Sequence, residues 1–117
     1  MDVGAVGLWT FQLDLQPAAA ARDIAREVEA QGWGALWIPE AVGREPLTHA
    51  GLLLGATRKL VVATGVANVW SRSPSATAAA QRLLADSSKG RFLLGLGDMI
   101  IGSENATFFD PHVTHGM

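Results

Sequence analysis

The chain has 117 residues, of which 49% are hydrophobic and 17% are charged. This length allows at most one domain, and the composition excludes a disordered chain or a fibrous repeat. Nine Lys and Arg residues against 11 Asp and Glu residues give a net charge of −2, so we expect no nucleic-acid partner. The sequence contains no cysteine, which excludes disulfides and a thiol nucleophile. The acidic N-terminus and the short apolar runs predict neither a signal peptide nor a membrane span, so we expect a cytoplasmic protein without a membrane partner.

Four short segments of mostly apolar residues are typical of strands buried on both faces of a parallel sheet. They span residues 6–11, 35–39, 60–66 and 92–96. The segments begin 29, 25 and 32 residues apart, and each gap contains one helical pattern. This spacing predicts the order β-α-β-α-β-α-β, with parallel strands arranged 1-2-3-4 and all three helices on one face of the sheet.

The three helices carry different start and stop signals. The first lies within residues 17–31 and is followed by Gly32, the second begins at Pro46 and runs to about Thr57, and the third has Ser73 as its N-cap before Pro74. The expected apolar faces are Ala21, Ile24, Ala25 and Val28, then Leu47, Ala50, Leu53 and Leu54, and then Ala76, Ala79, Ala80 and Leu83. His49 is expected on the solvated side of the second helix.

Both a doubly wound sheet and part of a (β/α)8 barrel contain this alternation. A complete barrel needs about 250 residues, so on the barrel reading the chain is half a barrel. The periodicity ends after Gly97, and we interpret residues 1–97 as a partial barrel domain and residues 98–117 as a divergent tail. Asp110, His112 and His115 have a superficial metal-ligand spacing, but they lack flanking elements, and we expect no metal site.

The segments GLWTFQLDLQP, GWGALWIPEAVGREPLTHA, LVVATGVANVWSRSP and GRFLLGLG occur in this order over about residues 6–97. Together they resemble the N-terminal half of the luciferase-like monooxygenase family, and within it the deazaflavin-dependent oxidoreductases that use coenzyme F420. The resemblance implies a (β/α)8 TIM barrel that holds the cofactor at the carboxyl ends of its strands. It also implies F420 as the cofactor, with FMN as the alternative.

The resemblance assigns roles to residues at the first two strand ends. Glu40 takes the place of an acid close to the cofactor ring and is our candidate catalytic residue, although the residues alone favour a solvated acid or a partner for Arg44. Family members often have a histidine next, whereas this chain has Ala41, so no imidazole relay is expected. Trp9 and Phe11 either border a substrate pocket or simply pack at the barrel mouth.

The third strand end is expected to back the cofactor. Gly65, Val66 and Asn68 match a segment that forms a bulge behind the ring in family members, often with a cis peptide bond, here Gly65–Val66. The alternative is an ordinary glycine at the end of a strand. Arg72, just before the third helix, is interpreted as a loop residue rather than a ligand.

These features predict an oxidoreductase that moves a hydride to or from a small organic substrate, present here as a truncated half barrel. The alternative is a non-catalytic truncated or frame-shifted fragment that acts at most as a self-associating domain. Barrels usually hold cofactor phosphates with loops after strands seven and eight, so the chain alone is expected to bind F420 weakly or not at all. Uncovered strand edges predict a homo-oligomer.

Overall fold

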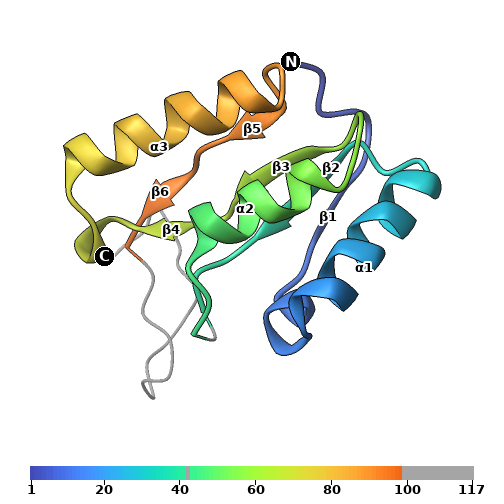
Figure 1. The fold of residues 1–117 in the computed structure, drawn as a ribbon, viewed down its shortest axis with the longest axis horizontal. Helices are drawn as coiled ribbons and strands as arrows, with labels where there is room; N and C mark the ends of the chain where they lie inside the picture. Colours follow the sequence, from blue (N-terminus) through green and yellow to red (C-terminus); the bar gives the residue numbers. More distant parts are fainter. Residues whose placement is uncertain (42, 99–117) are drawn as a thin grey trace.

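A computed structural model describes residues 1–41 and 43–98, in which strands and helices alternate along the sequence (Figure 1). The strands are β1 (Gly7–Trp9), β2 (Ala35–Ile38), β3 (Val61–Thr64), β4 (Ala67–Asn68), β5 (Phe92–Leu93) and β6 (Leu96–Gly97). The helices are α1 (Ala18–Ala30), α2 (Pro46–Gly55) and α3 (Pro74–Ser87), with the short 3₁₀ helices η1 (Gln12–Leu15) and η2 (Val69–Ser71).

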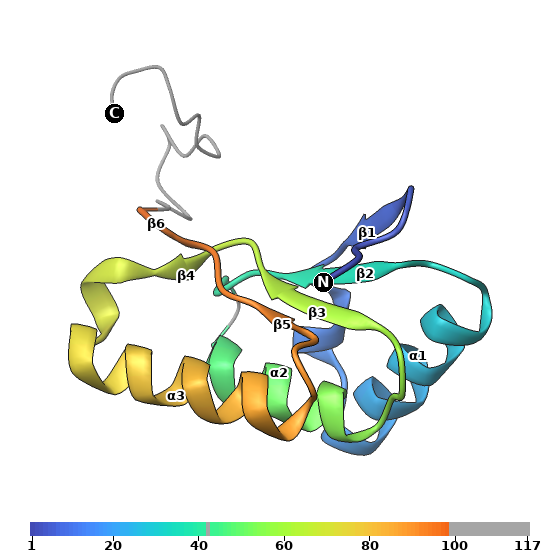
Figure 2. The ribbon, with the colours of Figure 1, turned by 90° about the horizontal axis from the view of Figure 1, so that it is seen from above.

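The strands β1, β2, β3 and β5 form one parallel sheet in that order, and β4 and β6 form a two-stranded parallel extension. All three helices cover the same face of the sheet (Figure 2). The predicted strand order and single layer of helices are therefore confirmed. The strands are shorter than the apolar segments, because η1 closely follows β1 and a bulge interrupts the third strand.

Local capping explains where α2 and α3 begin. The Ser73 hydroxyl oxygen accepts a backbone hydrogen bond in the first turn of α3, where Pro74 needs no N–H partner. The Glu45 carboxylate does the same for α2, which starts at Pro46. Both predicted starts are confirmed. After α3 the chain turns through Gly90 at a φ of 84°, a conformation that favours glycine.

A bulge separates β3 from β4. Ala63 pairs with Leu93 and Ala67 pairs with Leu96, so the third strand contains one residue more than its neighbour between these pairs. The Gly65–Val66 peptide bond within this bulge is cis. The bulge and the cis bond that the resemblance implied are both confirmed.

Gly95 approaches the bulge closely. The Thr64 hydroxyl lies 2.8 Å from both the backbone N and the backbone O of Gly95. A Cβ atom on Gly95 would lie 2.2 Å from the Thr64 carbonyl oxygen, so this contact has no room for a side chain. Thr64, just before the bulge, is thus held against the backbone of Gly95, which lies between β5 and β6.

The hydrophobic core lies between the sheet and the helices. Its buried residues come from alternating strand positions and from the inner faces of α1 and α2. The apolar faces predicted for these two helices are therefore confirmed. They include Leu36, Ile38, Val62 and Phe92 from the sheet, and Ala21, Ala25, Val28, Leu47, Ala50, Leu53 and Leu54 from the helices.

Two expectations about the helices are wrong. In α3 the buried residue is Thr77, and of the expected face Ala80 is partly buried against the core, whereas Leu83 is 66% exposed. An alanine-rich helix offers small apolar residues on several faces, so its periodicity did not define the inner one. His49 is only 3% exposed. It is buried because α2 lies between α1 and α3 and contacts both, which leaves little of its surface solvated.

Candidate functional site

The candidate residues lie at the carboxyl ends of the strands, as expected for a (β/α) barrel. Trp9 ends β1, Glu40 follows β2, and the bulge with Asn68 follows β3. Hydrogen bonds connect these three strand ends directly: Trp9 to Gly65, and Glu40 to Asn68. The structure therefore brings together residues that the sequence separates by up to 59 positions.

Trp9 reaches across the sheet to the bulge. Its indole Nε1 donates a 2.8 Å hydrogen bond to the carbonyl oxygen of Gly65. A Cβ atom on Gly65 would lie 3.4 Å from ring atoms of both Trp9 and Trp37, so both indoles lie against the bulge. Phe11 meets Trp9 edge to face, with 6.2 Å between ring centroids and 88° between planes. These aromatic rings form a wall beside the bulge, with Trp9 46% exposed.

Glu40 holds the segment after the bulge. Its backbone N–H donates to the Val66 carbonyl oxygen at 3.3 Å, and its Oε1 accepts the Asn68 backbone N–H at 2.7 Å. Oε1 also accepts a 2.7 Å hydrogen bond from Nη1 of Arg72. The possible pairing of Glu40 with Arg44 is therefore wrong, because the Arg44 guanidinium donates to backbone carbonyl oxygens of η1 and its end instead.

Asn68 and Val66 have local partners as well. The side-chain Oδ1 of Asn68 accepts the Trp70 backbone N–H at 2.9 Å and caps η2. Val66 lies against Gly97, where an added Cβ would be 3.1 Å from a Val66 methyl carbon. The contact of Asn68 with a cofactor ring stays a prediction.

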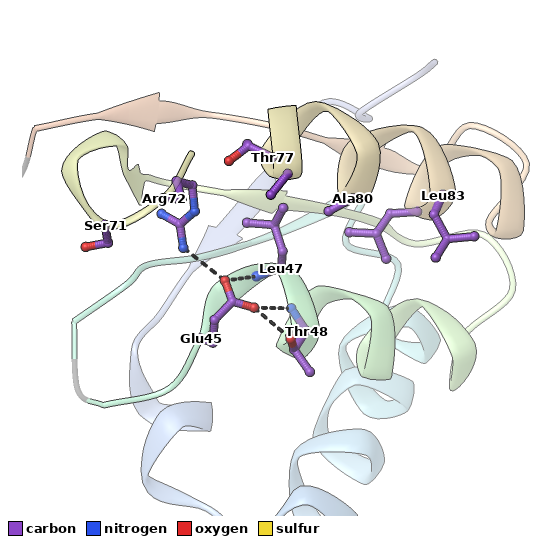
Figure 3. A pocket seen from close by; sticks show the side chains of 10 residues that line it. Glu45, Leu47, Thr48, Ser71, Arg72, Thr77, Ala80 and Leu83 are labelled. Carbon is purple, nitrogen blue, oxygen red and sulfur yellow. Dashed lines mark hydrogen bonds and ion pairs between the residues drawn. The ribbon is translucent and has the colours of Figure 1, made fainter. Parts of the chain in front are cut away.

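Arg72 and Glu45 are site residues that sequence reasoning missed. Nη2 of Arg72 donates to Oε2 of Glu45 at 2.9 Å, and Figure 3 shows Glu45 turned toward both Arg72 and the first turn of α2. Hydrogen bonding to Glu40, and then to Glu45, raises the pKa of Arg72 despite its burial. Burial alone would raise the pKa of Glu45, but hydrogen bonds from Thr48, Leu47 and Arg72 outweigh it and lower that pKa. No spacing in the sequence signals this pairing.

Two grooves adjoin this cluster. One of about 410 Å³ lies between α2 and α3, with Glu45 and Arg72 among its lining residues and Leu83 and Leu84 on its apolar wall (Figure 3). The other, of about 350 Å³, is lined by Glu40 and by residues 41 and 43–45. Trp9 and the bulge are not among the residues that line either groove.

This edge of the sheet suits a planar ring better than a phosphate chain. Exposed aromatic rings and the bulge supply flat surfaces and backbone groups. Both Nη atoms of Arg44 and of Arg72 already bind protein acceptors, and two carboxylates balance the charge of Arg72. Among the described residues no group of three His, Cys, Asp or Glu side chains could hold a metal ion, and Asp110, His112 and His115 lie outside them.

A model of the luciferase-like monooxygenase family matches residues 1–112, and the chain belongs to this family. The matched range extends beyond Gly97, where the resemblance quoted above ended. In residues 1–41 and 43–98, none of the helices combines the length and apolar character that crossing a bilayer requires.

Among solved structures, the chain is similar to the coenzyme F420-dependent tetrahydromethanopterin reductase from Methanopyrus kandleri. The match has a TM-score of 0.69 and 22% sequence identity, and it covers 80% of this chain and 27% of that chain. The fold is therefore part of a TIM barrel, as predicted. The chain spans about a quarter of the length of this solved relative.

Proposed function

We propose that the chain forms the ring-binding portion of an oxidoreductase that transfers a hydride between coenzyme F420 and a small organic substrate. One observation carries the proposal: Trp9 from the first strand and Glu40 from the second both bind the bulge at residues 65–68. The family and the F420-dependent solved relative support the choice of cofactor. When bound, the deazaflavin ring supplies the carbon that gives or accepts the hydride.

The residues of the chain have separate tasks in this proposal. Gly65, Val66 and Asn68 form the surface behind the ring, and Trp9 and Phe11 border the substrate. Glu40 fixes the bulge through the Asn68 amide, and its second carboxylate oxygen is the one placed to meet a ligand or exchange a proton. The ring-binding portion is assigned to residues 1–97, and residues 98–117 receive no role.

A titration with two ligands tests this proposal. Complete F420 and its ring portion without phosphate are added to the purified chain, and deazaflavin fluorescence is followed. If only the ring is held, both ligands bind with similar, weak dissociation constants near the millimolar range, which corresponds to about 4 kcal/mol. FMN, titrated in parallel, is expected to bind less well than F420.

Matched tryptophan variants locate the binding surface. Trp9→Leu should weaken ring binding several-fold. Trp70→Leu should not, because Trp70 is 77% exposed and lies on η2, after the bulge in the sequence. The absence of any ring binding would refute the proposal. Micromolar F420 binding with turnover would show instead that the chain is catalytic alone, and it would exclude the proposal that the chain holds the ring only.

A second candidate is a non-catalytic, self-associating fragment, and the uncovered sheet face favours it. Within the described residues, β1 and β5 are the outer strands of the sheet, and the helices cover only one face (Figure 2). Two copies joined at these edges would complete eight strands. We propose a homo-oligomer, expected to sediment at twice 12.3 kDa or more. A compact 12.3 kDa monomer that binds no hydrophobic dye would exclude it.

A further inference from the structure

Arg72 joins three separate parts of the chain. Its Nη1 donates to Glu40 after β2, its Nη2 donates to Glu45 at the start of α2, and Arg72 itself precedes α3. The Arg72 side chain is only 12% exposed, and those of Glu40 and Glu45 are 22% and 49% exposed. Two carboxylates thus hold one largely buried guanidinium in a fixed position. Figure 3 shows the contact of Arg72 with Glu45.

The same contact extends to the bulge. Oε1 of Glu40, which accepts from Arg72, also accepts the Asn68 backbone N–H. Nη1 of Arg72 additionally donates to the Asn68 carbonyl oxygen. The peptide groups on both sides of Asn68 are therefore tied to Arg72, one through Glu40 and one directly.

This geometry excludes two simpler roles for Arg72. Arg72 is not a ready anion ligand, because two carboxylates already balance its charge and would repel an incoming phosphate. Arg72 is also not part of an ordinary surface ion pair, which contributes little to stability because both side chains are exposed to water. The Arg72 side chain is largely buried.

We propose that Arg72 is a positioning residue: it holds Glu40 against the Asn68 amide and thereby fixes the surface of residues 65–68 on which the cofactor ring rests. The part of this inference that concerns the ring rests on the proposed function. The part that concerns Asn68 does not, since it describes the chain without ligand.

The first test needs no cofactor. Backbone amide exchange of Asn68 is measured by NMR in the chain and in Arg72→Lys, whose single ammonium group cannot present two separate nitrogens to Glu40 and Glu45. We expect Asn68 to exchange about tenfold faster in the variant, as the loss of one charge-assisted hydrogen bond implies. The Leu60 amide, which binds the Glu29 carboxylate, should keep its exchange rate.

Two further variants keep this test decisive. Arg82→Lys, on the exposed surface of α3, should leave Asn68 exchange unchanged. Glu40→Gln retains the shape and one acceptor, and it should speed Asn68 exchange even if Arg72→Lys fails to fold. In the Glu40→Gln background, Arg72→Lys should add little, because both changes act on one contact. Equal Asn68 exchange in all variants, or fully additive effects, would overturn the proposal.

The second test uses the phosphate-free ring. Arg72→Lys should weaken its binding about tenfold, and Arg82→Lys should not change it. If the unmodified chain binds no ring, the proposed function fails, while the Asn68 exchange result still decides whether Arg72 positions the bulge. If the chain binds the ring and Arg72→Lys binds it equally well, the proposed function stands and the role of Arg72 in it is refuted.

Discussion

The amino and carboxyl ends of the sheet both use charged side chains to hold backbone segments in place, but they do so in different ways. At the amino end, the Glu29 carboxylate accepts the backbone N–H groups of residues 58–60, and Arg91 donates to backbone or hydroxyl oxygens of residues 54, 57, 60 and 88. At the carboxyl end, Glu40 accepts one backbone N–H and shares Arg72 with Glu45. The exposed ring of Trp9 lies against Gly65 of the bulge, and the exposed ring of Phe11 lies against Trp9.

From this difference we expect the amino end to contribute mainly to stability and the carboxyl end to binding. The charged groups of the amino end bind the chain's own backbone and join α1, α2, β3 and β5. The carboxyl end holds its bulge through Trp9, Glu40 and Arg72, and it leaves aromatic surface uncovered. In (β/α) barrels the carboxyl end carries the working residues and the amino end serves stability, and we expect the two ends of this chain to follow the same division.

Replacing Arg91 should have the largest effect on stability. Arg91→Met keeps much of the side-chain volume but leaves several carbonyl oxygens near α2 and β3 without their donor. We expect the free energy of unfolding to fall by about 4 kcal/mol, or the chain to be unfolded at 25 °C. Urea unfolding followed by circular dichroism measures this loss. Arg58→Met, which changes an exposed side chain, is the control, and equal losses in the two variants would contradict the assignment.

Acid should weaken the carboxyl end through His49. Burial, and then the charge of Arg44, lower the pKa of His49 to about 4, and its Nδ1 lies 3.5 Å from Oδ1 of the buried Asp14. The unfolded chain binds a proton at His49 below about pH 6.5, while the folded chain does so only near pH 4. This contribution to stability is therefore complete above pH 6.5 and decreases as the pH falls toward 4, by about 3 kcal/mol in total.

A comparison with His49→Gln isolates that contribution. Denaturant unfolding of both proteins is measured between pH 7.5 and 4, so that carboxyl groups common to both cancel. The difference in unfolding free energy should shift in favour of the glutamine variant below pH 6.5. A difference that stays constant over this range would show that His49 titrates alike in the folded and unfolded chain.

Glu29 should respond at lower pH and by a smaller amount. Burial alone would raise the pKa of Glu29, but backbone hydrogen bonds from residues 59, 60 and 58 outweigh it, and the pKa lies below its ordinary value of 4.5. Glu29→Gln should lower the unfolding free energy by about 1 to 2 kcal/mol at neutral pH. The advantage of the carboxylate is present above pH 4.5 and is lost as the pH falls through the lowered pKa.

Thermal unfolding of Glu29→Gln at pH 7 and pH 3 measures this change. Glu27→Gln, on the exposed side of α1, is the matched control and should behave like the original chain. A deficit in Glu29→Gln that persists undiminished at pH 3 would mean that the charge of Glu29 is not its source.

Features with local causes could be predicted from the sequence. The starts of α2 and α3 follow from a capping residue before proline, and the strand order follows from the spacing of apolar segments. The bulge at Gly65 and the cis bond came from family resemblance and are confirmed. The inner face of α3 was not predictable, because its alanines suit either side of the helix.

The contacts that define the candidate site depend on distant partners. Glu40 and Arg72 are 32 positions apart, and the buried His49 lies beside Asp14 of η1, which is 35 positions earlier. No periodicity contains such information, since it depends on how the crossovers place one element beside another. Glu40 was identified by its place after a strand together with the family resemblance, whereas its bond to the Asn68 amide required the folded chain.

The smallest effect on stability is expected at Trp9, and it is the sharpest test of the division between the two ends. Trp9→Phe removes the indole donor to the Gly65 carbonyl oxygen and keeps an aromatic ring. Because Trp9 is 46% exposed, water can replace the lost bond, and the unfolding free energy should fall by less than about 1 kcal/mol.

Ring binding should respond more strongly than stability, since the indole lies against the surface proposed to hold the ring. We expect the dissociation constant of the phosphate-free deazaflavin ring to rise several-fold in Trp9→Phe and to stay unchanged in Trp70→Phe. Fluorescence titration and urea unfolding on the same samples measure both quantities. If Trp9→Phe instead destabilises the chain as much as Glu29→Gln does and binds the ring normally, then Trp9 serves the fold, and the carboxyl end is built for stability as the amino end is.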